Sequence, residues 1–81
     1  MEWYRRVLDA QENSLGKDHP DTLVTVCSMA NSLRRQGKYD EALEFFRRAL
    51  AGQEKSLGNG HPDTLATSQH IEEVLRELRL E

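Results

Sequence analysis

The chain has 81 residues, which suffices for one small domain with a single core and excludes a sizeable catalytic cavity. Its net charge of −3 gives no overall attraction to nucleic acid, and its one cysteine, Cys27, excludes an internal disulfide and a zinc site built from several cysteines. No apolar stretch approaches the length that spans a membrane. We therefore expect a cytoplasmic, non-catalytic protein without cofactor or metal, and without a nucleic-acid or membrane partner.

Helices are the only regular elements that the sequence predicts, because no alternating β-branched run of useful length competes with them. Their ranges are about residues 2–15, 20–36, 40–57 and 62–79. The first helix carries Trp3, Tyr4 and Leu8, and Leu15–Gly16 is typical of a helix end, where glycine adopts the left-handed conformation at low cost.

The second helix begins at Pro20, because proline at the first helical position has no N–H partner to lose, and Asp21 faces the positive end of the helix. Its apolar residues follow the i, i+3, i+4, i+7 spacing of one helix face: Val26, Met29, Ala30 and Leu33. Gly37 is expected to end this helix in a left-handed conformation. The third helix repeats the apolar spacing with Ala42, Leu43, Phe46, Ala49 and Leu50, and the fourth begins at Pro62–Asp63.

An internal repeat of 42 residues runs through nearly the whole chain. Residues 1–39 placed on 43–81 give 17 identical pairs, and LGKDHPDTL at 15–23 returns as LGNGHPDTL at 57–65. Repeats of this length are typical of helical solenoids, in which each unit buries its apolar face against its neighbours. The sequence therefore predicts an all-α, antiparallel helix-turn-helix solenoid of about four helices in a single domain, residues 1–81.

The spacing within the repeat resembles the tetratricopeptide repeat. Val26-x2-Met29-Ala30-x2-Leu33 fills the first part of that pattern, and GKYDEA followed by Phe46 fills the second. The repeat differs from the 34-residue form in its proline, which stands at Pro62 and not at position 54. With LG..HPDTL at the corner, the chain is similar to the 42-residue repeats of kinesin light chains.

The phase of the repeat predicts one complete unit, residues 20–61, flanked by two half units. The first helix lacks the helix that precedes it in a full unit, so we expect the chain to be an excerpt of a longer array. The last helix has Glu72 where the complete unit has the small Ala30. Since a buried unpaired glutamate costs several kcal/mol, we expect this helix to have a solvated outer face that caps the array.

The resemblance implies that the first helix of each unit lines a concave surface that binds a short extended peptide or a helix of a protein partner. In kinesin-light-chain-like grooves, asparagine and basic residues hold acidic peptides that contain an aromatic residue; here Ser28 stands at the asparagine position, with Asn31 one turn on. The candidate partner-binding residues are Val24, Cys27, Ser28, Asn31, Arg34, Arg35, Gln69, His70, Glu73 and Arg76. Alternatively, the second helix is uncharged from Thr22 to Leu33 because it is buried, and its two arginines complement the helix dipole.

Self-association is a second functional hypothesis. The first helix exposes the face that a preceding helix would cover, around Trp3 and Val7, and another copy of the chain could bury it as a homodimer or higher oligomer.

Other combinations of residues carry less weight. His19 with Asp21 and His61 with Asp63 could suggest a metal, but successive corners should lie too far apart to share an ion. Cys27 and His70 could suggest a nucleophile and a base, but the sequence offers no third residue to orient them. The sequence therefore favours structural roles for the corners and for Cys27.

Overall fold

The computed structural model describes the backbone of residues 2–80 and the side chains of residues 3–79. The described part contains four α-helices and no strand. The helices are α1 (Glu2–Ser14), α2 (Pro20–Arg35), α3 (Tyr39–Ser56) and α4 (Pro62–Leu80). Their ends lie within one residue of the ranges expected from the sequence, and the predicted all-α class is confirmed.

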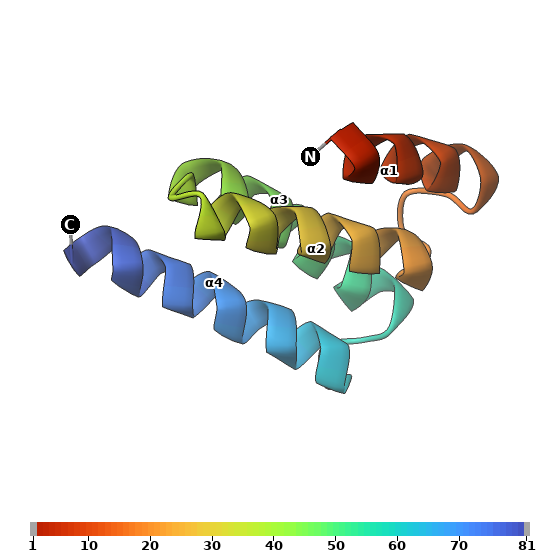
Figure 1. The fold of residues 1–81 in the computed structure, drawn as a ribbon. Coiled ribbons are helices and arrows are strands. Elements are labelled where there is room, and N and C mark those ends of the chain that lie inside the picture. Colours follow the sequence, from red (N-terminus) through yellow and green to blue (C-terminus); the bar gives the residue numbers. More distant parts are fainter. Residues whose placement is uncertain (1, 81) are drawn as a thin grey trace.

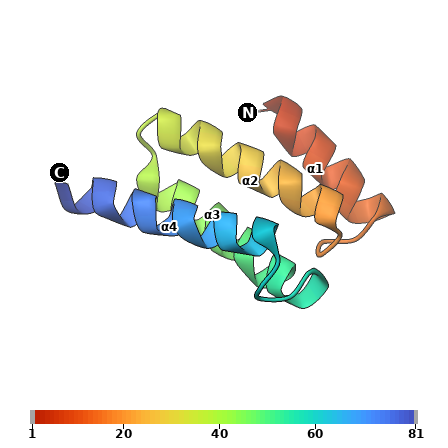
Figure 2. The same ribbon diagram turned by 90° about the horizontal axis from the view of Figure 1, so that it is seen from below.

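Consecutive helices run in opposite directions and form a helical solenoid (Figures 1 and 2). Helix α3 packs against both α2 and α4, while α1 packs against α2. Figure 1 shows α1 and α4 on opposite sides of the α2–α3 pair, with α2 and α4 running in the same direction. The first helices of two successive units, α2 and α4, therefore share α3 as a common support.

Each corner between units is closed by a histidine and a glycine. The backbone N–H of Asp21 donates to His19 Nδ1 at 3.1 Å, and the N–H of Asp63 donates to His61 Nδ1 at 3.1 Å, so both histidines cap a helix N-terminus. Proline follows each cap, as expected. Gly16, Gly37 and Gly58 have φ values of 95°, 83° and 89°, which explains why glycine ends the first three helices.

The core is made of two adjacent clusters that together draw on all four helices. The first cluster joins α2, α3 and α4; its buried residues are Ala30, Leu33, Ala42, Leu43, Phe46 and Val74. The second joins α1, α2 and α3; its buried residues are Leu8, Val26, Met29 and Ala49. The predicted apolar faces of the second and third helices are therefore buried against each other, as solenoid packing requires.

Equivalent residues of the two repeats differ in burial where a neighbouring helix is present for one and not for the other. Leu23 is 1% exposed and packs against α3 at Gly52, where an added Cβ would lie 2.6 Å from Leu23 Cδ2. Leu65, its equivalent 42 residues later, is 53% exposed. Glu72 is also exposed on α4, which agrees with the solvated face expected there.

We predict that Leu23→Ala and Leu65→Ala, the same substitution at equivalent repeat positions, differ in their effect on stability. Leu23→Ala should lower the free energy of unfolding by about 2–4 kcal/mol, because it leaves a cavity between α2 and α3. Leu65→Ala should change it by less than about 1 kcal/mol, because little apolar area is buried there. Urea denaturation followed by circular dichroism measures both values; equal losses would contradict the observed difference in packing.

Candidate functional site

A hollow of ≈ 230 Å³ lies between α2 and α4, and α3 contributes one residue to its lining. We call it the α2–α4 hollow. Its lining residues are Val24, Cys27, Ser28 and Asn31 from α2, Gln53 from α3, and Asp63, Ala66, Thr67 and His70 from α4. Five of the residues that the sequence assigned to a partner-binding face meet here: Val24, Cys27, Ser28, Asn31 and His70. The repeat thus brings the first helices of two units to one surface.

The other candidate partner-binding residues lie outside this lining. Arg35 and Gln69 are exposed. Arg76 borders a different hollow of ≈ 210 Å³, which it lines together with Glu72, Leu75 and Arg79. The structure therefore separates Arg76 from the α2–α4 hollow.

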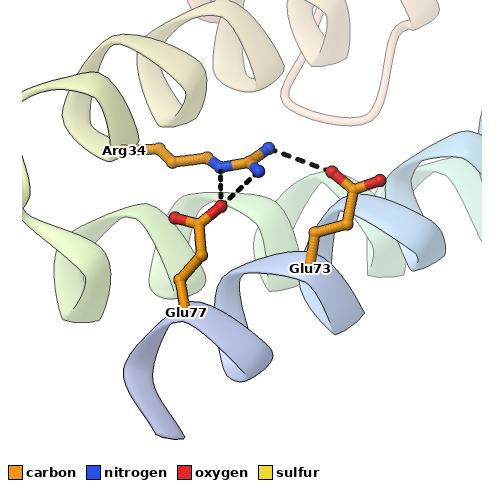
Figure 3. Close-up of polar contacts among 3 residues, drawn as sticks. All are labelled: Arg34, Glu73 and Glu77. Carbon is orange, nitrogen blue, oxygen red and sulfur yellow. Dashed lines mark hydrogen bonds and ion pairs between the residues drawn. The ribbon is translucent and has the colours of Figure 1, made fainter. Parts of the chain in front are cut away.

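Arg34 ties the C-terminal half of α2 to α4 through two carboxylates (Figure 3). Its Nε donates to Glu77 Oε1 at 2.9 Å, one terminal nitrogen donates to Glu73 Oε2 at 3.2 Å, and the other terminal nitrogen also pairs with Glu77. These hydrogen bonds raise the pKa of Arg34 and lower the pKa of Glu77. Two of the predicted binding residues, Arg34 and Glu73, are therefore already bound to each other.

Cys27 is a half-buried thiol on the α2 side of the hollow. Burial raises its pKa, a hydrogen bond with Thr67 opposes that effect, and the negative charge of Asp63 adds to it. Its Sγ lies 3.7 Å from Thr67 Oγ1. Since a thiolate is the reactive form of cysteine, this environment suits a packing residue and not a nucleophile.

His70 contributes to both the core and the hollow. Its ring stacks on Phe46 of α3, with ring centroids 5.4 Å apart and an interplanar angle of 17°. Its Nδ1 is buried and has no hydrogen-bond partner within the described part of the chain. The ring thus fixes α4 on α3, and His70 also belongs to the lining of the hollow.

Four lining residues, Gln53, Asp63, Ala66 and Thr67, are not among the partner-binding residues predicted from the sequence. Gln53 belongs to α3, whereas the concave face was assigned only from the first helices of the units. The sequence places Asp63 at the corner between units and gives Thr67 no role. The repeat carried a signal for two of them, since Gln53 and Thr67 are the identical counterparts of Gln11 and Thr25, which touch each other across α1 and α2.

Two further hollows of the described chain are lined by none of the predicted partner-binding residues. One of ≈ 310 Å³ lies at the turn between α2 and α3, where Lys38, Asp40 and Glu41 help to line it. Another of ≈ 250 Å³ lies between α1 and α3, beside Arg48, which forms an ion pair with Glu12 at 2.9 Å. Both mix charges of opposite sign, so neither offers a consistent electrostatic environment for a ligand.

Metal binding and membrane insertion find no structural support in the described residues. No group of three His, Cys, Asp or Glu side chains in the described part could hold a metal ion. Among the residues described, no helix has the length and apolar character needed to cross a membrane. The corner histidines instead accept backbone hydrogen bonds through Nδ1.

The exposed aromatic residue of α1 is Trp3, whose exposed fraction is 72%. Its equivalent in α3, Phe45, is partly buried and packs against both core clusters. Val7 is half-buried. Trp3 therefore presents a large apolar surface on the side of α1 that the rest of the described chain leaves open.

We predict slow alkylation of Cys27 in the folded protein, with a rate that increases only at a higher pH than for a free cysteine. Because the folded pKa is raised, the unfolded chain loses its proton first as pH rises above about 8.5. Folding stability should therefore decrease as pH rises from that value through the folded pKa. Iodoacetamide kinetics over a pH range of about 6–10 measure the alkylation rate. Rapid reaction at neutral pH would contradict the prediction.

A family model described as Tetratricopeptide repeat matches the chain over two overlapping segments, residues 2–55 and 25–81. No curated protein sequence matches the chain. The first segment covers α1 to α3, and the second covers most of α2 together with α3 and α4. The family model therefore matches both copies of the repeat. Tetratricopeptide repeats generally mediate protein–protein interactions and serve as non-catalytic scaffolds. With both segments carrying the repeat and the helices arranged as a solenoid, the chain belongs to the tetratricopeptide repeat family.

Proposed function

We propose that this chain is a non-catalytic interaction module that binds a short peptide or a helix of a protein partner in the α2–α4 hollow. The observation that carries the proposal is that two first helices, α2 and α4, line one hollow with polar groups, of which only Asp63 is a carboxylate, between small or apolar side chains. Val24 and Ala66 are exposed at its edges, while Asn31 and Ser28 are partly accessible. We also propose the kinesin-light-chain-like type, which rests on the 42-residue spacing and the LG..HPDTL corners.

The size of the hollow sets the expected strength of binding. A volume of ≈ 230 Å³ accommodates one or two side chains of a partner, and the described chain presents a single such hollow between first helices. Stable protein–protein interfaces bury about 800 Å² on each partner, more than such a hollow offers. We therefore expect dissociation constants in the range of about 10 μM to 1 mM for peptides bound to this chain alone.

A neutral substitution inside the hollow should weaken peptide binding. Ala66→Gln fills the hollow with a larger side chain and should raise the dissociation constant about fivefold or more. The matched control is Ala51→Gln, the same substitution at an exposed alanine of α3 outside the lining. A library of acetylated decapeptides, screened by ¹⁵N chemical-shift changes, supplies the probe for both variants. Equal affinities for the two variants, or shift changes away from the hollow, would contradict the proposed site.

Self-association through α1 is a second candidate function, favoured by the 72% exposure of Trp3 where Phe45, its repeat equivalent, is packed. Burial of a tryptophan contributes about 2–3 kcal/mol to an interface, which is a large share of the binding energy of a small dimer. The half-buried Val7 would extend the contact along the same helix.

If α1 mediates a dimer, Trp3→Glu should shift the equilibrium to the monomer by a factor of at least about 30 in the dissociation constant. Val24→Glu, which places the same charge on an exposed apolar position of α2, serves as the control and should leave the mass unchanged. Sedimentation equilibrium over about 5–500 μM measures both. A monomer at every concentration would eliminate this candidate.

A further inference from the structure

The charges around the α2–α4 hollow are mainly negative. Asp63 is the charged residue among its lining side chains, and no lysine or arginine of the described chain lines it. Further toward the C-terminus of α4, beyond the hollow, the carboxylates of Glu73 and Glu77 surround the single guanidinium of Arg34 (Figure 3). These three side chains carry a net charge of −1, so Arg34 contributes no excess positive charge to this surface.

The field of Asp63 extends into the hollow. Burial is the main cause of the raised pKa of Cys27, which lines the α2 side of the hollow, and the negative charge of Asp63 on the α4 side raises that pKa further. A positive group placed between the two helices would therefore be stabilised, whereas a carboxylate there would be repelled.

A buried acceptor lies in the same hollow. Gln53 is 4% exposed, and its Oε1 has no hydrogen-bond partner among the residues that the structure describes. A buried carbonyl oxygen without a donor costs about as much free energy as a lost hydrogen bond, so such atoms in folded proteins call for an explanation.

The first repeat shows how this acceptor is satisfied elsewhere. Thr25 Oγ1 donates to Gln11 Oε1 at 2.5 Å, and these residues are the equivalents of Thr67 and Gln53. In the second repeat Thr67 Oγ1 instead donates to the backbone oxygen of Asp63 at 3.1 Å and lies beside Cys27 Sγ. The same pair of residue types thus forms a bond in one copy, whereas in the other copy Gln53 Oε1 has no donor among the described residues.

We propose that the α2–α4 hollow binds a lysine or arginine side chain of a basic partner peptide, which donates to Gln53 Oε1 and lies near the carboxylate of Asp63. The proposal rests on the proposed function and specifies its ligand. Ammonium and guanidinium groups are donors only, so they match a lining that offers an unpartnered acceptor and a negative charge. It differs from the acidic peptide that the resemblance to kinesin light chains implies, because Arg34, the cation expected to bind acidic residues, is held by Glu73 and Glu77.

The test uses two Gly/Ser decapeptides that are identical except that one carries two lysines and the other two glutamates. Each is titrated into the ¹⁵N-labelled chain at about 20 and 150 mM NaCl, so that the Debye length changes from about 20 to 8 Å. At about 20 mM NaCl the lysine peptide should bind about tenfold more tightly than the glutamate peptide, and it should shift the amide signals of the hollow residues.

A matched pair of variants locates the charge that acts. Asp63→Asn should weaken binding of the lysine peptide about three- to tenfold. Asp21→Asn is its control, since Asp21 occupies the same position of the first helical turn in the other repeat, with the same hydrogen bond to a capping histidine, but does not line the hollow. Equal losses for both variants would overturn the assignment to Asp63.

A further variant tests the buried acceptor. Gln53→Met keeps the side-chain length and removes the unpartnered oxygen, so it should weaken lysine-peptide binding without lowering the urea midpoint of the free chain. A lower midpoint with unchanged binding would overturn the role of Gln53, because it would show that this residue acts only in folding.

The two proposals fail in different ways. Binding of the glutamate peptide in the hollow, as tightly as the lysine peptide or more so, would overturn the cation site and leave the peptide-binding function standing. The same holds if a library peptide without lysine or arginine binds there while the lysine peptide does not. If neither the two decapeptides nor any library peptide shifts the hollow residues, both proposals are wrong.

Discussion

The packing of α3 against both α2 and α4 is the contact on which the rest of the structure depends. Phe46 is fully buried and stacks on His70 of α4, while Gly52 lets Leu23 of α2 approach the α3 backbone. These two contacts lie on different sides of one helix, so α3 fixes the spacing between two helices that are not neighbours in sequence. The α2–α4 hollow exists because α3 supports both of its walls and provides Gln53 between them. Alanine and glycine in α3 make this possible, because small side chains allow helices to approach closely.

Arg34 links the C-terminal halves of α2 and α4, beyond the hollow. Its hydrogen bonds to Glu73 and Glu77 join α2 to α4 directly, in addition to the contact between Cys27 and Thr67 and the support from α3. An ion pair at a partly exposed position contributes little to stability, about 0–1 kcal/mol, so its main consequence is electrostatic. It removes a free cation from the surface that a partner would contact and leaves Asp63 as the charge that a bound peptide meets within the hollow.

Local sequence signals predicted the helices well because each depends on a few adjacent residues. Pro20 and Pro62 mark helix starts, Gly37 marks a helix end, and the spacing of Val26, Met29, Ala30 and Leu33 marks the buried face. The capping role of His19 and His61 was not predicted, although both precede Pro-Asp at the same spacing, because histidine is uncommon as an N-cap. The candidate site was predicted in part: Val24, Asn31 and His70 do meet, because helical periodicity and the 42-residue repeat together define which face of each first helix is shared.

The sequence by itself determined the helices, the direction in which each presents its apolar face, and the stacking of repeated units, since these follow from short-range backbone preferences and from burial of apolar side chains. Only the tertiary structure decided which polar groups are satisfied. Arg34 pairs with carboxylates 39 and 43 residues away, and Gln53 lacks the bond that its repeat equivalent Gln11 forms with Thr25. These hydrogen bonds depend on distances of a few ångströms between side chains on different helices. The same residue types at equivalent positions of two repeats therefore do not specify the same hydrogen bonds, because each copy has different neighbours.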